Sequence, residues 1–181
     1  MAGIRFEPQI RFEMQGQQGQ YLCWIAVAVS VAAHFNASST LQQCQLVDKL
    51  PHGGPHTGHG PPGTCCGASL ANGPCDNTGR LDVALGAIPG VDHLNGVMGR
   101  MTFEQVQAEI DNRLPVCAYI SLFGERIGHF ILISGYNVVN GVQYLFVNDP
   151  QNQDGVHPYD EVATNYRFVG SWQNSYKLKK A

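Results

Sequence analysis

The amino-acid sequence predicts an α+β domain, with a helical N-terminal half followed by an antiparallel sheet. Capped, apolar segments typical of helices occupy about residues 15–112. From about residue 113 to residue 181 the pattern changes to β-branched and aromatic runs separated by turn residues, which are typical of strands. Helices and strands that are segregated along a chain in this way are characteristic of α+β domains.

Four helices are predicted in the first half. The first is a central helix whose apolar run is interrupted only by Ser30 and His34. The second has a choice of N-cap residues, Ser38, Ser39 or Thr40. The fourth begins with the capping box Thr102-Phe103-Glu104-Gln105. The predicted ranges are 22–35, 39–50, 79–87 and 102–112.

Four strands are predicted in the second half. Two of them flank the dipeptide Asn140-Gly141, which is a strong signal for a tight hairpin and makes these strands antiparallel neighbours. The last predicted strand has a possible break at Gly170. The predicted ranges are 116–123, 129–138, 142–147 and 166–178.

Length and composition indicate a single domain over residues 1–181. With 44% hydrophobic residues the chain can bury a sound core, and a formal net charge of −3 provides no basic patch for nucleic acid. No apolar run approaches the roughly 18 to 20 residues of a membrane span. Residues 1–14 carry charges and no apolar core, so we expect no signal peptide there. Neither nucleic acid nor a membrane is therefore expected as a partner.

Residues 17–24, Gln-Gln-Gly-Gln-Tyr-Leu-Cys-Trp, have the features of a thiol-based acyl-transfer site. Cys23 stands at the predicted start of the central helix. The helix dipole and the unpaired backbone N–H groups at a helix N-terminus stabilise a thiolate. Gln17, six residues earlier, has an amide that can donate to an oxyanion. The alternative is a buried cysteine and tryptophan that only pack in a core helix.

Partners for such a nucleophile occur in the predicted sheet. His129 lies near the start of one strand of the expected hairpin, and Asn148 and Asp149 lie near the end of the other. Because the two strands are antiparallel neighbours, these residues are expected to come close in space. Neighbouring side chains of a strand face opposite sides, so only one of Asn148 and Asp149 is expected to reach His129. A nucleophile, a base and a group that orients the base are thus all present.

Taken together, these motifs resemble the papain-like cysteine peptidases. The resemblance is strongest to their compact bacterial branch, which includes proteases of double-glycine leader peptides and secreted effector proteases. It implies a papain-like fold, in which the central helix carries the cysteine and packs with an antiparallel sheet. The matching segments are residues 17–24, Gly128-His129-Phe130, Val147-Asn148-Asp149-Pro150, and the cysteine-containing segments at 43–46, 64–67 and 75–76.

When the functional residues of the family are carried over to the matching positions, the resemblance implies a role for each site residue. Cys23 would be the nucleophile, His129 the general base and acid, and Gln17 the oxyanion donor. Family members use Asp or Asn as the third member. The Asp-Pro at the strand end favours Asp149, and Asn148 is the alternative. Spacing favours Gln17 over the other glutamines of the same loop, which are Gln15, Gln18 and Gln20.

The remaining cysteines bear on the compartment. Cys117 lies in an apolar strand, where a buried thiol is common. Papain-like folds often carry disulfides in the helical half, so the other four are possible disulfide cysteines. Neighbouring cysteines rarely bond to each other, which leaves two pairings of the four, and reduced, packed thiols are the alternative. The four are Cys44, Cys65, Cys66 and Cys75.

A segment rich in glycine, proline and histidine, residues 51–62, is predicted to be a surface loop. Its three histidines and the nearby cysteines could bind zinc, but their spacing matches no metal-binding motif closely. We therefore expect no metal and no cofactor. The histidines are His52, His56 and His59.

The predicted activity is cleavage of protein substrates through a Cys-His-Asp triad. A small domain without a signal peptide that resembles delivered effectors suggests a toxin that cleaves a specific protein inside another cell. Delivery would need a different machine, and a cognate inhibitor, or immunity protein, would protect the producer; otherwise the enzyme would be cytoplasmic. The same groups can also catalyse glutamine deamidation or transglutaminase-like acyl transfer. Leader-peptide processing is a further alternative, and a non-enzymatic binding module is disfavoured because every catalytic group is present.

Overall fold

The computed structural model describes residues 7–50, 63–67, 70–93 and 98–180. The chain divides into two compact units. The sheet unit contains Met1–Phe12, Gly96–Asp149 and Gln153–Lys177, and the helical unit contains Glu13–Asn95, Pro150–Asn152 and Leu178–Ala181.

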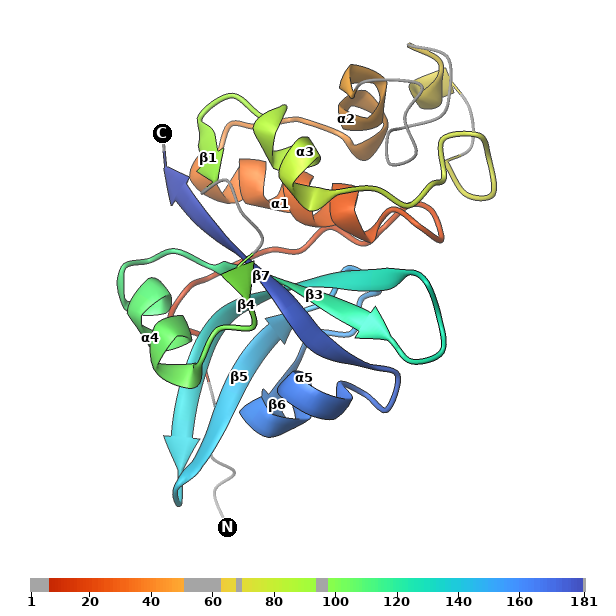
Figure 1. Cartoon of the computed structure of the whole chain (residues 1–181). Coiled ribbons are helices and arrows are strands. Elements are labelled where there is room, and N and C mark those ends of the chain that lie inside the picture. The colour runs from red at the N-terminus through yellow and green to blue at the C-terminus, as the bar shows by residue number, and fades with distance from the viewer. Residues whose placement is uncertain (1–6, 51–62, 68–69, 94–97, 181) are drawn as a thin grey trace. The chain divides into compact units, whose positions relative to one another are not determined.

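The sheet unit is built on antiparallel strands in the order β7-β3-β4-β5-β6, with β2 also paired to β7 (Figure 1). The apolar side chains of the central strands, such as Ile120, Ile131 and Leu145, are completely buried. Mixed helices and antiparallel sheet confirm the predicted α+β class. The strands are β2 (Met98–Gly99), β3 (Val116–Leu122), β4 (Gly128–Val139), β5 (Val142–Asn148), β6 (Gly155–Pro158) and β7 (Gly170–Lys180).

The β4–β5 hairpin forms where Asn140-Gly141 predicts it. Val139 pairs with Val142, and the two residues between them have the positive φ angles of a type I′ turn, 51° at Asn140 and 78° at Gly141. Asparagine and glycine tolerate this left-handed backbone better than other residues. The turn sets the register that brings the start of β4 and the end of β5 to the same end of the hairpin.

Two helices of the sheet unit pack against its strands. Helix α4 (Phe103–Asp111) begins at the predicted capping box, in which Thr102 N–H donates to Gln105 Oε1 at 2.9 Å. Its buried face includes Val106 and Ile110. Helix α5 (Tyr159–Asn165) follows β6 directly and buries Val162 against the sheet.

The helical unit is organised around α1 (Cys23–Phe35), whose first ten residues are all buried. An apolar helix of this kind must be surrounded by other elements, because no face of it tolerates water. It is accompanied by α2 (Gln43–Lys49), the short 3₁₀ helix η1 (Cys65–Gly67) and α3 (Leu81–Gly86). Strand β1 (Val91–His93) pairs with the last three residues of β7. Among the described residues, no helix is both long enough and apolar enough to cross a bilayer.

The second helix is shorter than predicted. It begins at Gln43 rather than near residue 39, and its N-cap is Gln42, whose backbone N–H donates to Gln45 Oε1 at 2.9 Å. The N-cap assignment to Ser38, Ser39 or Thr40 is therefore wrong. Ser38 donates from its N–H and from its hydroxyl to Asn36 Oδ1, so this polar segment forms a local turn in place of a helical one.

The C-terminal segment also differs from its prediction. Strand β7 begins at Gly170, and Tyr166 makes only an isolated bridge to Gly170. Residues 155–165, for which the sequence predicts no helix or strand, form β6 and α5. Helix α5 has only seven residues and β6 has four, and elements this short present too few residues for a periodic pattern.

We expect Gly79→Ala to destabilise the protein by about 1–3 kcal/mol, because a Cβ at this position would overlap the ring of Trp24. Trp24 is buried and cannot move easily, since its Nε1 donates to the Asn77 carbonyl at 2.9 Å. Urea unfolding would measure the change. Gly67→Ala is the matched control, because a Cβ there meets no atom of the described residues within 4 Å. An equal loss in both variants would contradict the prediction.

Candidate active site

The segment before α1, residues 15–22, is called the nucleophile loop below. It ends at Leu22, the N-cap of α1, and Cys23 is the first helical residue. Leu22 provides no side-chain cap. The first backbone N–H groups of a helix have no partner within the helix, so they and the helix dipole favour negative charge at the cysteine. This is the local environment that the sequence predicts for a nucleophilic thiol.

Gln17 is oriented by its own loop. Its Nε2 donates to the carbonyls of Gly19 at 2.8 Å and Gln20 at 2.9 Å. Its backbone N–H donates to the Pro150 carbonyl at 2.7 Å. Its Oε1 is buried and has no hydrogen-bond partner among the described residues. The amide is thus held in one orientation by backbone carbonyls that lie only two and three residues away.

In the sheet unit, His129 and Asp149 form a buried pair. His129 Nε2 lies 2.7 Å from Asp149 Oδ1, and the two residues are 8% and 1% exposed. His129 is the second residue of β4, and Asp149 directly follows β5, so the hairpin register brings them together. A carboxylate in this position fixes the ring and stabilises its protonated form.

Asn148, the alternative partner of His129, is directed elsewhere. Its Nδ2 donates to Asp154 Oδ2 at 3.0 Å. The other oxygen of Asp154 accepts from the backbone N–H of Asp149 at 2.8 Å. Adjacent residues at the end of β5 thus face different partners, and the structure places Asp149, not Asn148, against the histidine ring.

Tyr166 holds the second oxygen of Asp149. Its hydroxyl donates to Asp149 Oδ2 at 2.9 Å. Burial, with the nearby Asp149 charge, raises the pKa of the Tyr166 phenol far above its usual range, so the group stays a neutral donor. With one oxygen on His129 and the other on Tyr166, the carboxylate is held in a single orientation.

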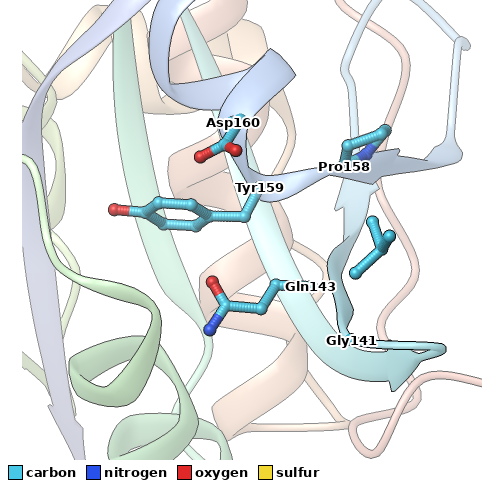
Figure 2. Close-up of a pocket in the computed structure, with 6 residues that line it drawn as sticks. Gly141, Gln143, Pro158, Tyr159 and Asp160 are labelled. Carbon is cyan, nitrogen blue, oxygen red and sulfur yellow. The ribbon is translucent and has the colours of Figure 1, made fainter.

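The structure divides the predicted site residues between the units. Gln17 and Cys23 belong to the helical unit, and His129 and Asp149 belong to the sheet unit, where they are in contact. A pocket of about 200 Å³ lies at the turn of the β4–β5 hairpin (Figure 2). His129 lies at the opposite end of this hairpin, so the pocket is not part of the candidate site. It is lined by Gly141, Val142, Gln143, Pro158, Tyr159 and Asp160.

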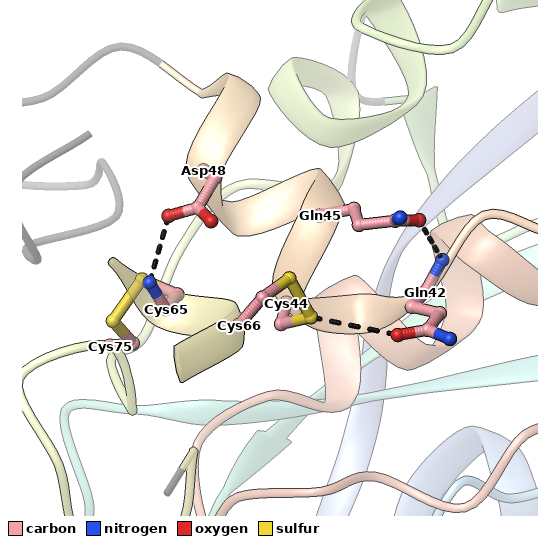
Figure 3. The surroundings of a disulfide bond; sticks show 7 residues. All are labelled: Gln42, Cys44, Gln45, Asp48, Cys65, Cys66 and Cys75. Atoms are coloured by element: carbon pink, nitrogen blue, oxygen red, sulfur yellow. Dashed lines mark hydrogen bonds between the residues drawn. A yellow bond between two sulfur atoms is a disulfide. The ribbon is translucent and has the colours of Figure 1, made fainter. Parts of the chain in front are cut away.

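The six cysteines are of two kinds. Cys44 is bonded to Cys66 and Cys65 to Cys75, which is one of the two pairings left open by the sequence (Figure 3). Cys23 and Cys117 are not in disulfides. Cys117 is completely buried in β3, and burial raises the pKa of its thiol. Cys23 is also buried but keeps 6% exposure, whereas Cys117 has none, so a thiol reagent that acts on the folded protein should react first with Cys23.

The zinc alternative has little support. The alternative needs ligands from three histidines and from the nearby cysteines Cys65, Cys66 and Cys75. These cysteines are in disulfides and cannot supply thiolate ligands. The histidines His52, His56 and His59 lie outside the described residues, as does the predicted loop at 51–62. Within the part of the chain that the structure describes, no group of three or more His, Cys, Asp or Glu is arranged to hold a metal ion.

Sequence reasoning assigned no role to several residues that support the site. Tyr166 and Asp154 hold Asp149, while Gln43 and Asp76 contact the nucleophile loop. Gln43 is 1% exposed and Asp76 is 6% exposed. Buried polar residues are unusual enough to indicate a specific role, but burial is known only from the structure. Gln43 and Asp76 stand in the matching segments at 43–46 and 75–76, but the resemblance gives them no role, and Asp154 and Tyr166 stand in no motif.

A thiol at a helix N-terminus and an imidazole–carboxylate pair are the groups of a cysteine hydrolase. The chain matches the model of the Peptidase_C39 like family over residues 4–180, nearly its whole length, and it belongs to this family. The predicted resemblance is thereby confirmed. The protein is a cysteine peptidase, a hydrolase that acts on peptide bonds and so has a protein substrate. A search of curated proteins found no match.

Proposed function

We propose that the protein is an endopeptidase in which Cys23, His129 and Asp149 form the catalytic triad and Gln17 donates to the oxyanion. The two units would together form one papain-like domain over residues 1–181. The observation that supports this most directly is the buried 2.7 Å contact between His129 and Asp149, in a cysteine peptidase whose Cys23 begins α1.

In the proposed reaction the Cys23 thiolate attacks the scissile carbonyl carbon and forms an S–C bond. The negative charge moves to the carbonyl oxygen, which accepts hydrogen bonds from Cys23 N–H and Gln17 Nε2. Gln17 would exchange one of its two bonds to loop carbonyls for this oxyanion. His129 then gives its proton to the amine as the C–N bond breaks, leaving a thioester on Cys23.

Water completes the cycle. His129 takes a proton from a water molecule, whose oxygen attacks the thioester carbonyl, and the C–S bond breaks to release the acid and the thiolate. Asp149 contacts Nε2 of His129, so the proton that is exchanged in both steps is assigned to Nδ1. Asp149 orients the ring throughout and stabilises its positive charge.

The loop that carries Gln17 is bonded, within the helical unit, to the residue that follows Asp149 in the sequence. The Gln17 N–H donates to the carbonyl of Pro150 at 2.7 Å. Pro150 is the residue directly after Asp149 in the sequence. The loop of the proposed oxyanion donor is therefore anchored to the residue that follows the proposed third member of the triad.

For the biological role, we favour an effector or toxin that cleaves a specific protein in a target cell, with a cognate inhibitor in the producer. The two disulfides support a protein that spends time in an oxidising environment, since such bonds are rare in a reducing cytosol. A leader-peptide processing protease remains the competing peptidase role.

We expect cells that express the wild-type protein to contain a short set of new protein N-termini that are absent from cells expressing Cys23→Ala. Without the thiol no thioester can form, so each of these cuts should disappear in the variant. Mass spectrometry of protein N-termini would identify the targets and the cleavage sites. Cuts that persist with Cys23→Ala would contradict the proposal. Substrates that gain about one dalton, or a conjugate, without being cleaved would also contradict it, because this is the result expected of a deamidase or acyltransferase.

A further inference from the structure

The nucleophile loop is held by two buried polar side chains, Gln43 and Asp76, that have no part in the proposed reaction. Both lie far from the loop in sequence, and each makes more than one bond to its backbone. We infer that they are positioning residues, which hold the loop so that Gln17 is presented to the oxyanion. This inference rests on the proposed function of Gln17.

Asp76 binds the part of the loop next to the nucleophile. Its Oδ2 accepts from Gln20 N–H at 2.9 Å and from Asn72 N–H at 3.0 Å, and its Oδ1 accepts from Tyr21 N–H at 2.8 Å. Hydrogen bonds to an ionised acceptor are stronger than those between neutral groups. Two of these bonds fix the backbone two and three residues before Cys23, and the bond from Asn72 helps to hold the carboxylate itself.

Asp76 acts on Gln17 through the backbone that it holds. Asp76 accepts from the N–H of Gln20, and the carbonyls of Gly19 and Gln20 accept from Gln17 Nε2. A shift of this backbone would therefore move the amide of Gln17. Reorganisation of an oxyanion donor costs free energy, and a fixed backbone would limit the change at Gln17 to the exchange of one of its two bonds to loop carbonyls.

Gly19 is needed for this approach. A Cβ at Gly19 would lie 2.5 Å from Asp76 Oδ1, closer than Cβ atoms come to their neighbours. Only a glycine lets the carboxylate come this near to the loop. Gly19→Ala should thus displace Asp76 while leaving its charge unchanged.

Gln43 holds the other end of the loop. Its Nε2 donates to the Gly16 carbonyl at 2.8 Å, and its Oε1 accepts from Gln18 N–H at 3.0 Å. These bonds lie on both sides of Gln17, so they fix the backbone from which its side chain extends. Ser30 Oγ accepts from Gln15 N–H at 2.8 Å and completes the anchoring of this end.

The disulfides secure both positioning residues. Gln43 precedes Cys44, which is bonded to Cys66, and Asp76 follows Cys75, which is bonded to Cys65. Figure 3 shows Cys65 and Cys66 as neighbours in one short helix, so the two bridges meet there. The segments that carry Gln43 and Asp76 are thereby linked covalently through adjacent residues.

The test replaces Asp76 by Asn, which keeps the shape but has one oxygen for three N–H donors. We expect kcat on fluorescein-labelled, denatured casein to fall by about 10- to 100-fold, part of the loss seen when an oxyanion donor is removed, with KM little changed. Alkylation of Cys23 by iodoacetamide involves no oxyanion and should keep its rate. Gly19→Ala should likewise lower kcat and leave the rate of Cys23 alkylation unchanged. In the double variant, kcat should fall by a smaller factor than the product of the two single reductions.

Asp92→Asn is the control, because it removes the same charge from an exposed position of the helical unit. Unchanged kcat in folded Asp76→Asn would overturn the inference, and so would a parallel loss of kcat and Cys23 alkylation, which a merely structural role predicts. If wild type cleaves casein and Cys23→Ala cleaves it at the same rate, the proposed function fails instead; if wild type leaves casein intact, kcat is measured on a target identified from the new N-termini. Hydrogen exchange at the Gln20 and Tyr21 amides then decides whether Asp76 holds the loop: faster exchange in Asp76→Asn supports it, and equal exchange overturns it.

Discussion

His129→Ala is expected to lower kcat on a cleaved substrate by about 10⁴- to 10⁶-fold, the range seen when the base of a triad is removed. The ring is assigned two proton transfers, one to the leaving amine and one from water, and alanine can perform neither. If the proposed triad forms, the rate at which iodoacetamide modifies Cys23 near neutral pH should fall as well, because an imidazolium next to a thiol favours the thiolate. Steady-state kinetics and peptide mapping would measure the two effects.

A second imidazole–carboxylate pair provides the control. His157 Nδ1 lies 3.0 Å from Glu161 Oε1 in the same unit. His157→Gln removes a histidine with a carboxylate partner, but from a pair to which we assign no chemistry. Its kcat should remain close to that of the wild type. Comparable losses in His129→Ala and His157→Gln would show that neither ring is the base.

Asp149→Ala is expected to lower kcat by about 10²- to 10⁴-fold, because His129 loses both its orientation and the charge that stabilises its protonated form. The variant also leaves the hydroxyl of buried Tyr166 without its acceptor, so a loss of stability should accompany the loss of rate. Kinetics at a temperature well below the unfolding transition would separate the two effects.

The neighbouring residue tests the choice of the third member. Asn148→Ala removes a bond to Asp154, which in turn holds the backbone of Asp149. Its effect on kcat should therefore be small beside that of Asp149→Ala. If instead Asn148→Ala caused the larger loss, Asn148 would be the orienting residue and the assignment of Asp149 would be wrong.

The parts of the fold that were predictable from sequence have strong local signals. Asn140-Gly141 predicted the β4–β5 hairpin because few residue pairs adopt its backbone angles, and Thr102 with Gln105 predicted the start of α4. The predicted cap at Ser38, Ser39 or Thr40 was wrong because the Asn36 side chain offered Ser38 a local partner. Helix α5 was missed since its stability depends on packing of residues such as Val162, which a short pattern does not reveal.

In the candidate site, too, the residues with strong local signals were predictable and those that depend on long-range contacts were not. Cys23, His129 and Gln17 stand in motifs of characteristic spacing, so they could be proposed as a set. The choice between Asn148 and Asp149 depends on which way two adjacent side chains turn at the end of β5, and the sequence left both open. Gln43 and Asp76 reach the nucleophile loop only through long-range contacts, which carry no local signal. The catalytic roles themselves stay predictions for kinetics to test.

The two disulfides and the thiol of Cys23 require opposite redox conditions. A thiol peptidase needs a reduced nucleophile, yet a reductant that protects Cys23 also attacks the bridges. Access to a sulfur governs which bridge reacts first. Cys66 is exposed, whereas Cys65 and Cys75 are buried. Reduction should therefore open the Cys44–Cys66 bridge first, so that the Gln43 side of the loop would loosen while the Asp76 side still holds.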